Sequence, residues 1–439
     1  MRPRLPAICF LFAALSGPAL AAETSADCRL GIYRMADGSD VDIAKSEGKT
    51  LRWRRPDGTS GQLAEKEGEW TSTLGWTGRP DGHRVAFSSC EAGQVRFDGA
   101  TGQRIPLVVK GTRFQGDGVS LVGRLVLPPG DGPVPIVVLL HGSEDDGAVA
   151  SNSLQRRLPA QGVGAFVYDK RGTGDSGGRY TQDFQLLARD AVAALKEARR
   201  LAGARAGRVG FQGPSQGGWV APIAAHQVAA DFVIVGFGLA VSVLDEDREA
   251  LVMNLQAKGH GEAAMAQAMK FADAAHELAQ HPTREEFDRF LIVRDRYRGE
   301  PWFKDAHGNF IFALKELDAK AFEANVWLLK RGTPWTYDPS STIATLNVPQ
   351  LWMLAADDVD APAAETARRL ERLRQHGRPI SVAVFPRTEH GVFEFETQAD
   401  GKRLSTRQPS GYLPMLVDFA RGDALQSSYG GVKASRPLK

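Results

Sequence analysis

The chain has little cysteine and no strong excess of charge of either sign, and both shortages narrow what it can be. Its 439 residues include three cysteines, and 54 Lys and Arg against 52 Asp and Glu give a formal net charge of +2. So small a net charge offers no electrostatic footprint for nucleic acid or another polyanion. With 43% hydrophobic and 24% charged residues, the composition is typical of a globular protein and not of a disordered or fibrous one.

Long apolar runs are also scarce, and the one that stands out lies at the start of the chain. Arginines at positions 2 and 4 precede an apolar stretch over residues 5–15, and Ala-Leu-Ala at 19–21 follows a Gly-Pro break. This order of basic start, apolar centre and small-residue end is typical of a secretory signal peptide. We therefore predict that residues 1–22 are a cleaved signal peptide and that the mature protein is periplasmic or secreted. No later run approaches the roughly 18 apolar residues of a membrane helix, so no membrane span is expected in the mature chain.

The shortage of cysteine becomes informative in an exported protein. Cleavage of the signal peptide removes Cys9 and leaves two cysteines, Cys28 and Cys90. An even number of cysteines in an oxidising compartment is usually paired. We predict a disulfide between Cys28 and Cys90. Two free buried thiols are the alternative, because sequence alone does not show that the side chains meet.

Residues 23–103 carry the pattern of a small β-rich accessory domain. Stretches in which apolar and polar residues alternate, such as 51–54, lie between turn signals such as Asp-Gly at 37–38 and Pro-Asp-Gly at 56–58. Alternation with a period of two is typical of half-buried antiparallel strands. The predicted disulfide would tie the start of this domain to one of its last strands.

From residue 104 to 439, strand-like runs alternate with helical stretches, which predicts an α/β domain built on a mostly parallel sheet. Several runs are continuously apolar, as strands buried on both faces require. The expected strands lie at residues 107–114, 119–127, 136–140, 165–168, 209–212, 232–235, 351–354 and 380–385.

The interval between the expected strands at 232–235 and 351–354 is too long for a loop in a compact domain. It is rich in helix-forming residues, above all over 262–280 and 284–297. We therefore predict an inserted helical cap at about residues 239–345. Aromatic side chains in this segment either line an acyl pocket or form the core of the cap; they are Trp302, Phe303, Trp327 and Trp335.

One local motif points to a catalytic nucleophile. Gly-Pro-Ser-Gln-Gly at 213–217 directly follows the predicted strand 209–212 and precedes a helical stretch. Small residues at 213 and 217 let a strand and a helix approach closely, and the turn between them exposes Ser215 at the carboxyl end of the strand. A glycine-rich turn without chemistry is the alternative.

A second match to the same pattern, Gly-Asp-Ser-Gly-Gly at 174–178, lies in a different context. Its letters are those of trypsin-like proteases, which need an upstream histidine and aspartate in an all-β double barrel. Residues 172–177 also fit Gly-x-Gly-x-x-Gly, but no helix opens inside that motif. We predict a structural turn here and no dinucleotide site.

A serine nucleophile needs a base and a carboxylate that orients the base. Downstream of Ser215, the strand 351–354 is followed by aspartates at 357, 358 and 360, and the strand 380–385 leads to His390. The carboxyl ends of parallel strands meet at one edge of a sheet, so these side chains are expected near Ser215. His376 is the weaker candidate for the base, because it lies in an arginine-rich stretch.

Five motifs in this order resemble those of the α/β-hydrolase superfamily. They are His-Gly-Ser at 141–143, Tyr-Asp-Lys-Arg-Gly-Thr-Gly at 168–174, the Ser215 motif, the acidic segment that ends at Pro362, and Phe-Pro at 385–386 followed by His390-Gly. From about residue 105 onward the chain is similar to bacterial esterases with an N-terminal accessory domain, and to relatives of the prolyl-oligopeptidase and dienelactone-hydrolase groups. The resemblance implies an α/β-hydrolase fold with a mostly parallel eight-stranded sheet and helices on both faces.

The same resemblance implies roles for single residues. In the family the acid commonly stands four residues before a proline, which selects Asp358 and makes Asp357 and Asp360 structural or surface carboxylates. One oxyanion donor is expected from the backbone N–H of Gln216 at the helix start. The resemblance implies that the second oxyanion donor is the backbone N–H of Ser143. After Ser143 the chain departs from the family, because Glu-Asp-Asp at 144–146 stands where Gly-Pro is common.

These residues predict a serine hydrolase, and we expect a carboxylesterase that cleaves small-molecule esters through an acyl-serine. A serine peptidase acting on short peptides or aminoacyl amides is the alternative, since Glu144, Asp145 or Asp146 could bind a peptide amine. A non-catalytic binding protein on a hydrolase scaffold is the alternative from another class. The sequence indicates no nucleic-acid partner and leaves the oligomeric state open.

No cofactor and no metal ion are required by this chemistry. His276 and His281 nearly imitate the helix of a zinc protease, but they are five residues apart and do not share a helix face as ligands at i and i+4 do. The sequence therefore implies no metal site.

Overall fold

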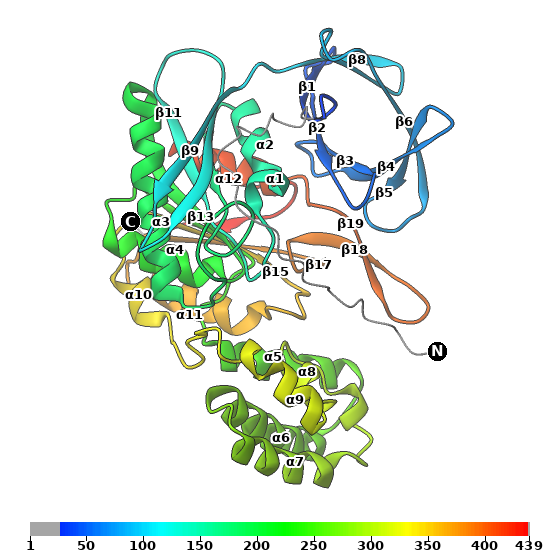
Figure 1. Cartoon of the computed structure of the whole chain (residues 1–439), viewed down its shortest axis with the longest axis vertical. Coiled ribbons are helices and arrows are strands. Elements are labelled where there is room, and N and C mark those ends of the chain that lie inside the picture. The colour runs from blue at the N-terminus through cyan, green and yellow to red at the C-terminus, as the bar shows by residue number, and fades with distance from the viewer. Residues whose placement is uncertain (1–26, 438–439) are drawn as a thin grey trace, which may run out of the picture.

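The computed structural model describes residues 27–437, which form a β-barrel, a mixed sheet between helices, and a helical cap (Figure 1). The cap lies at the far end of the molecule from the barrel. The predicted signal peptide, residues 1–22, lies outside the described residues.

The barrel contains eight strands, each antiparallel to the next, and β8 pairs with β1 to close it. Inward side chains such as Tyr33, Trp53 and Phe97 form a core of their own. Short turns join the strands, which suits the alternating pattern of the sequence. The strands are β1 (Gly31–Met35), β2 (Asp40–Lys45), β3 (Leu51–Arg54), β4 (Ser60–Lys66), β5 (Glu69–Leu74), β6 (Pro80–Phe87), β7 (Gln94–Phe97) and β8 (Ala100–Arg104).

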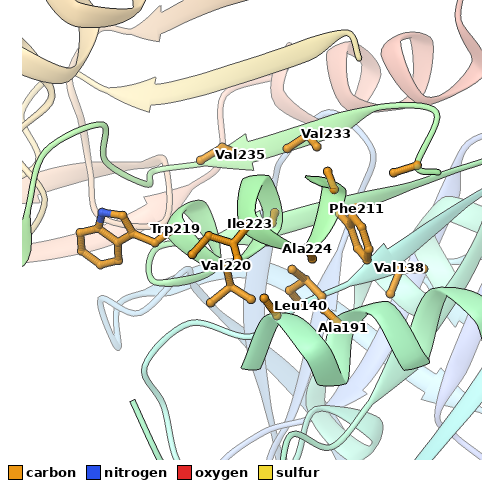
Figure 2. Close-up of a cluster of buried hydrophobic side chains, with 14 of the residues drawn as sticks. Val138, Leu140, Ala191, Phe211, Trp219, Val220, Ile223, Ala224, Val233 and Val235 are labelled. Atoms are coloured by element: carbon orange, nitrogen blue, oxygen red, sulfur yellow. The ribbon is translucent and has the colours of Figure 1, made fainter. Parts of the chain in front are cut away.

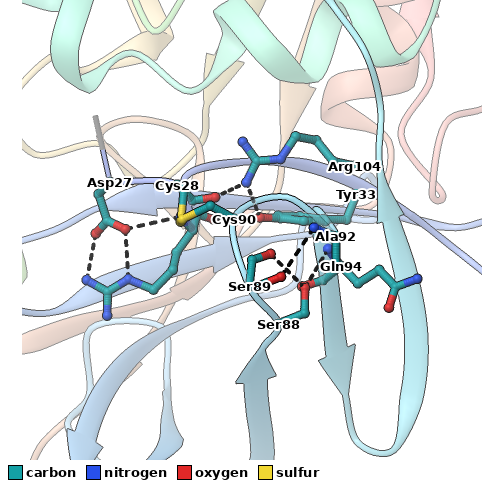
Figure 3. Close-up of a disulfide and its surroundings, with 10 residues drawn as sticks. Asp27, Cys28, Tyr33, Ser88, Ser89, Cys90, Ala92, Gln94 and Arg104 are labelled. Carbon is teal, nitrogen blue, oxygen red and sulfur yellow. Dashed lines mark hydrogen bonds and ion pairs between the residues drawn. A yellow bond between two sulfur atoms is a disulfide. The ribbon is translucent and has the colours of Figure 1, made fainter. Parts of the chain in front are cut away.

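A disulfide joins Cys28, just before β1, to Cys90, in the turn between β6 and β7 (Figure 3). The predicted pairing is therefore confirmed. Beside it, Arg104 donates hydrogen bonds to the carbonyl oxygen of Cys28 and, at 2.7 Å, to the hydroxyl of Tyr33. Since Tyr33 pairs with Arg104 across β1 and β8, the disulfide lies near the seam that closes the barrel.

The mixed sheet has the strand order β20-β16-β15-β14-β13-β11-β12-β10-β9. Strands β11 to β16 are parallel, and β9, β10 and β20 are antiparallel to their neighbours. The strands are β9 (Val108–Gln115), β10 (Ser120–Leu127), β11 (Val134–Leu139), β12 (Gly164–Tyr168), β13 (Ala206–Pro214), β14 (Val233–Gly236), β15 (Gln350–Ala355), β16 (Ile380–Phe385) and β20 (Ala434–Ser435).

Eight of these strands coincide with the expected ones, and the ninth, β20, corrects the expected number. Its two residues carry no periodic signal, so only the position of the chain end against β16 reveals it.

Helices cover both faces of this sheet because its central strands are apolar throughout. Val138 and Leu140 face one core, with α3 and α4, whereas Val137 and Leu139 face the other, with α2 and α12. Figure 2 shows the first core, in which residues of α4 pack over the strands. The helices are α1 (Ala148–Ser151), α2 (Leu154–Ala160), α3 (Phe184–Ala202), α4 (Gly217–Gln227), α10 (Ser340–Thr345), α11 (Ala363–Gln375) and α12 (Tyr412–Arg421), with a 3-10 turn at Gly203–Arg205.

The cap helices α5, α7 and α9 begin where the sequence provides N-cap side chains. Ser242, Thr283 and Asp318 each accept a hydrogen bond from the backbone N–H three residues on. The cap has its own apolar core, which contains Trp302 and Phe303. Its helices are α5 (Val243–Ala257), α6 (Glu262–Gln280), α7 (Arg284–Tyr297), α8 (Ile311–Lys315) and α9 (Ala319–Asn325), with 3-10 turns at Phe303–Asp305 and Val326–Leu328.

A third sheet of three short strands lies beside the body and below the barrel in Figure 1. Its strands are β17 (Thr388–Glu389), β18 (Phe393–Thr397) and β19 (Arg403–Arg407). The barrel also meets the body at α2, where Arg156 donates to the buried carboxylate of Asp42 at 2.5 and 3.1 Å. Within residues 27–437, no helix combines the length and apolarity that a bilayer crossing needs.

Candidate active site

Ser215 occupies the turn between β13 and α4. Its φ of 47° lies in the left-handed region, which is strained for a residue with a side chain. The N–H of Ser215 donates to the carbonyl oxygen of Gly236 at 2.9 Å and holds the turn. A Cβ on Gly213 would lie 2.1 Å from the carbonyl oxygen of Gly217, so no larger residue fits there. The turn therefore has the shape of a nucleophile elbow.

Asp358 follows β15 and is buried, with 1% of its surface exposed. Its Oδ1 accepts hydrogen bonds from the N–H groups of Asp360 and Ala361 at 3.0 and 2.8 Å. Its Oδ2 lies 2.9 Å from Nδ1 of His390. Because an ionised carboxylate only accepts, Nδ1 carries the proton and Nε2 is left as the basic nitrogen of His390.

His390 lies at the turn between β17 and β18, where Phe237 packs against the imidazole with ring centroids 4.9 Å apart. Burial lowers the pKa of His390, but the hydrogen bond to Asp358 and the negative charges of Asp358, Asp360 and Glu389 outweigh burial. The pKa of His390 therefore lies above its ordinary value of 6.5. A raised pKa makes His390 a stronger base for taking the proton of a serine.

A cavity of about 800 Å³ opens between the body and the cap, and both Ser215 and His390 line it. Most of the cavity wall is apolar, and residues of both the body and the cap contribute to it. The apolar lining residues are Phe184, Trp219, Val243, Phe310, Ala313, Leu314, Leu317, Phe322, Val326, Leu328, Leu329 and Trp335.

The four aromatic residues of the cap named from the sequence lie in different places. Trp335 lines the cavity, and Trp302 and Phe303 belong to the core of the cap. Trp327 is 55% exposed, next to the lining residue Leu328.

Both proposed oxyanion donors belong to residues of this wall. Gln216 directly precedes α4, and Ser143 follows the His-Gly turn after β11. Ser143 and Gln216 line the cavity together with Ser215. The carbonyl oxygen of Ser143 accepts a hydrogen bond from the hydroxyl of Tyr180, which holds this loop. No motif in the sequence marks Tyr180 as part of the site.

Glu144 is tied to the loop and does not line the cavity. Its Oε1 accepts from the N–H of Gly142 at 3.2 Å and lies 3.4 Å from Nδ1 of His141. Burial raises the pKa of Glu144, but the hydrogen bond and charge of His141 and the charge of Lys170 lower it more, to about 2. A carboxylate among residues 144–146 was expected to bind a substrate amine. None of these three residues is part of the cavity wall.

Two other carboxylates line the cavity instead, those of Glu246 and Asp360. Glu246 lies in the first turn of α5 and is half-buried. Burial and the negative charges of Asp247, Asp358 and Asp360 raise its pKa well above the ordinary value. Asp360 is thus a carboxylate of the cavity wall. No sequence motif could have identified Glu246, because only the folding of the cap over the sheet brings Glu246 to the cavity.

Asp358, Asp360 and His390 offer ligand atoms within 4.8 Å of one another, as a metal site would. However, Asp358 already accepts from two backbone N–H groups and from His390. The chemistry of these three residues therefore fits an acid–base pair better than a metal centre. His276, from the zinc-like motif, pairs instead with Asp247 in the cap at 2.9 Å.

The three candidate catalytic residues lie within a stretch that matches a known protein family. The family model described as X-Pro dipeptidyl-peptidase (S15 family) matches residues 117–390, a range that includes Ser215, Asp358 and His390. The chain belongs to the S15 family. This S15 member is accordingly a serine hydrolase with the α/β-hydrolase fold and an N-terminal β domain. None of the curated proteins matches the chain.

Solved structures similar to this S15 member include esterases and a peptidase. An esterase of Pyrococcus furiosus is 16% identical, with 65% of this chain and 85% of that one covered and a TM-score of 0.41. An acylaminoacyl peptidase of Pyrococcus horikoshii is 14% identical, with 86% and 55% covered and a TM-score of 0.43. A thermophilic esterase from Thermogutta terrifontis is 16% identical, with 64% and 91% covered and a TM-score of 0.36.

Proposed function

We propose that this serine hydrolase is a carboxylesterase that acts on esters with a bulky apolar acyl group. The observation that carries the proposal is the cavity of about 800 Å³, whose mainly apolar wall includes Ser215 and His390. A wall of this kind buries acyl chains, and each buried methylene contributes about 0.8 kcal/mol to binding.

The proposed reaction has two halves. Oγ of Ser215 attacks the ester carbonyl carbon while Nε2 of His390 takes the hydroxyl proton, and that proton then passes to the departing alcohol. In the second half, water attacks the acyl-serine, His390 takes a proton from the water, and Ser215 regains it as the carboxylic acid leaves. Asp358 orients His390, and the N–H groups of Ser143 and Gln216 stabilise the oxyanion in both halves.

Initial rates on p-nitrophenyl esters of increasing acyl length test this proposal, with Ser215→Ala as the control. We expect turnover that depends on Ser215 and a KM that falls as the acyl chain grows, because longer chains bury more apolar surface in the cavity. Turnover confined to acetyl esters would contradict the bulky acyl group, and no Ser215-dependent ester turnover would contradict the esterase.

Peptide hydrolysis is the second candidate, and a specific observation favours testing it. Glu246 and Asp360 both line the cavity, and a substrate ammonium group beside them would favour the ionised form of Glu246, whose pKa is otherwise raised by burial and by its negative neighbours. The family is named for X-Pro dipeptidyl-peptidases, so the matching substrates are X-Pro p-nitroanilides.

The variant Glu246→Gln separates the two candidates. A peptidase that binds its substrate amine at Glu246 would lose anilide turnover through a higher KM, whereas hydrolysis of uncharged esters would be kept. Anilide turnover that exceeds ester turnover in the parent protein would make the peptidase the main activity.

We also propose that the protein works outside the cytoplasm, in the periplasm or after secretion. The signal-like sequence of residues 1–22 and the Cys28–Cys90 disulfide support this, since disulfides persist in oxidising compartments. The N-terminus of the protein recovered from the periplasm or medium tests it. An intact N-terminus in a cytoplasmic fraction would contradict it.

A further inference from the structure

His390 is carried by a hairpin that stands away from the main sheet. It begins the three-residue turn between β17 and β18, where Glu389 pairs with Phe393. Gly391 and Val392 in this turn both have positive φ, and Val392 is buried in the core of the body. A Cβ on Gly391 would lie 2.6 Å from the ring of Phe393, so this ring lies directly against the turn that holds His390.

The other side of this hairpin is held by the barrel. Trp76, just after β5, contacts Phe393 edge to face with ring centroids 4.8 Å apart. Trp76 is itself fixed by Arg52, whose guanidinium lies 3.9 Å from the indole and donates to the carbonyl oxygen of Gly75 at 2.7 Å. A row of contacts therefore runs from the barrel through Trp76 and Phe393 to the turn of His390.

Backbone contacts run beside this row. The N–H of Trp76 donates to the carbonyl oxygen of Ser405 in β19 at 2.9 Å, and the N–H of Gln408 donates to Gly58 in the barrel at 3.1 Å. Cβ atoms on Gly58 and Gly75 would come within 1.9 and 2.3 Å of carbonyl oxygens of the hairpin segment, so only glycines permit so close an approach. The barrel turns at Gly58 and Gly75 are thus in close backbone contact with the segment of β19.

The hairpin also reaches the carboxylate partner of His390. Arg403 in β19 donates to the carbonyl oxygen of Asp357 at 2.6 Å, and the N–H of Asp357 donates to Thr388 in β17 at 2.9 Å. Asp358 is the next residue, so the position of the hairpin affects both members of the hydrogen bond between Asp358 and His390.

We propose that the barrel is a positioning domain for His390, and that Trp76 is the positioning residue through which it acts. The inference rests on the proposed function, because a positioned base has a consequence only where His390 takes part in catalysis. The barrel is not a lid over the substrate, since no residue of its strands is among the described residues that line the cavity.

The experiment compares Trp76→Ala with two matched variants. Trp76→Phe keeps an aromatic ring against Phe393. Phe87→Ala removes an aromatic contact of the same kind from the barrel, because Phe87 packs edge to face on Trp70 with centroids 5.7 Å apart. Ester turnover is expressed per active site, titrated with a fluorophosphonate, so that loss of folded protein does not count as loss of rate.

We expect Trp76→Ala to lower kcat about tenfold with little change in KM, because a base misplaced by a fraction of an ångström impairs proton transfer and not substrate binding. Trp76→Phe should recover most of the rate, and Phe87→Ala should match the parent protein. Equal kcat values for Trp76→Ala and Phe87→Ala would overturn the proposal.

A second measurement needs no substrate and separates this inference from the proposed function. The Nδ1 proton between His390 and Asp358 should give a far-downfield proton NMR signal at low pH, absent in Asp358→Asn. We expect the signal to be shifted or broadened in Trp76→Ala and unchanged in Phe87→Ala. An unchanged signal in Trp76→Ala would overturn the positioning role, whereas a parent protein without ester turnover would overturn only the esterase.

Discussion

At the scale of single residues, Asp358 and His390 show how one hydrogen bond determines which nitrogen is basic. The carboxylate of Asp358 accepts three hydrogen bonds while buried, and one of them comes from Nδ1 of His390. That arrangement leaves Nε2 unprotonated on the side of the ring opposite Asp358. The base thus depends on a carboxylate that need not touch substrate.

Replacing Asp358 by Asn should therefore lower kcat by roughly 10⁴-fold, because the amide no longer selects the tautomer with a basic Nε2. Steady-state rates on the best ester measure the loss. Asp357→Asn is the matched control, one position away, and should keep its rate. A similar loss in both variants would mean that the charge of the whole segment matters and not the bond to His390.

The activity should also depend on pH through His390. Its pKa is raised above 6.5, and only the neutral imidazole accepts the proton of Ser215, so kcat/KM should fall as the pH drops through that raised pKa. Asp360→Asn removes one of the charges that raise the pKa and should shift the acid limb of the pH profile to lower pH. A limb that moves to higher pH, or stays in place, would contradict this account.

At the scale of elements, the elbow between β13 and α4 is tightly constrained by its backbone. The carbonyl oxygen of Gly217 occupies the space that a Cβ at position 213 would need. Helix α4 therefore lies against β13 as closely as backbone atoms permit, and Ser215 is pushed to a positive φ at the tip.

We expect Gly213→Ala to destabilise the protein by about 1–3 kcal/mol and to abolish most turnover, because the helix must move away from the strand. Thermal unfolding and ester rates measure the two effects. Gly111→Ala, at a position in β9 with no atom within 4 Å of the added Cβ, is the control and should change neither. A fully active Gly213→Ala would show that the elbow tolerates a wider turn.

At the scale of the whole molecule, a disulfide lies near the seam of a barrel that in turn contacts a hairpin of the hydrolase body. Cys28 and Cys90 are 62 residues apart. Cross-linking a loop of this length removes conformational entropy from the unfolded chain worth about 4 kcal/mol in the chain-entropy model.

The double variant Cys28→Ala with Cys90→Ala should accordingly unfold at a lower temperature, with a loss of about 2–4 kcal/mol in denaturant titration. If the barrel positions His390, kcat per active site should fall as the barrel opens, before the α/β body unfolds. The reduced parent protein should behave like the variant. Coincident loss of barrel and body in one transition, with no earlier loss of kcat, would contradict this order.

Local patterns were enough to predict much of this architecture. The runs expected as strands coincide with β9 to β16, and α6 and α7 have the bounds that helical composition indicated. The pairing of Cys28 with Cys90 was predicted because they are the two cysteines that remain after the predicted signal peptide. Ser215 and His390 were singled out because a strand-turn-helix motif and the order of strands are properties of nearby residues.

What the sequence by itself determined is therefore the strands β9 to β16, the cap helices α6 and α7, and the candidates Ser215 and His390, because periodicity, turn residues and motif order act over short distances. The choice of Asp358 came from the family resemblance, and the structure decided that Cys28 and Cys90 meet. Only the tertiary structure decided that Glu246 and Asp360 face the cavity and that β20 pairs with β16. It alone also brought Trp76 against Phe393. These contacts join segments far apart in the chain, and their partners are selected by packing, which leaves no periodic trace in the sequence.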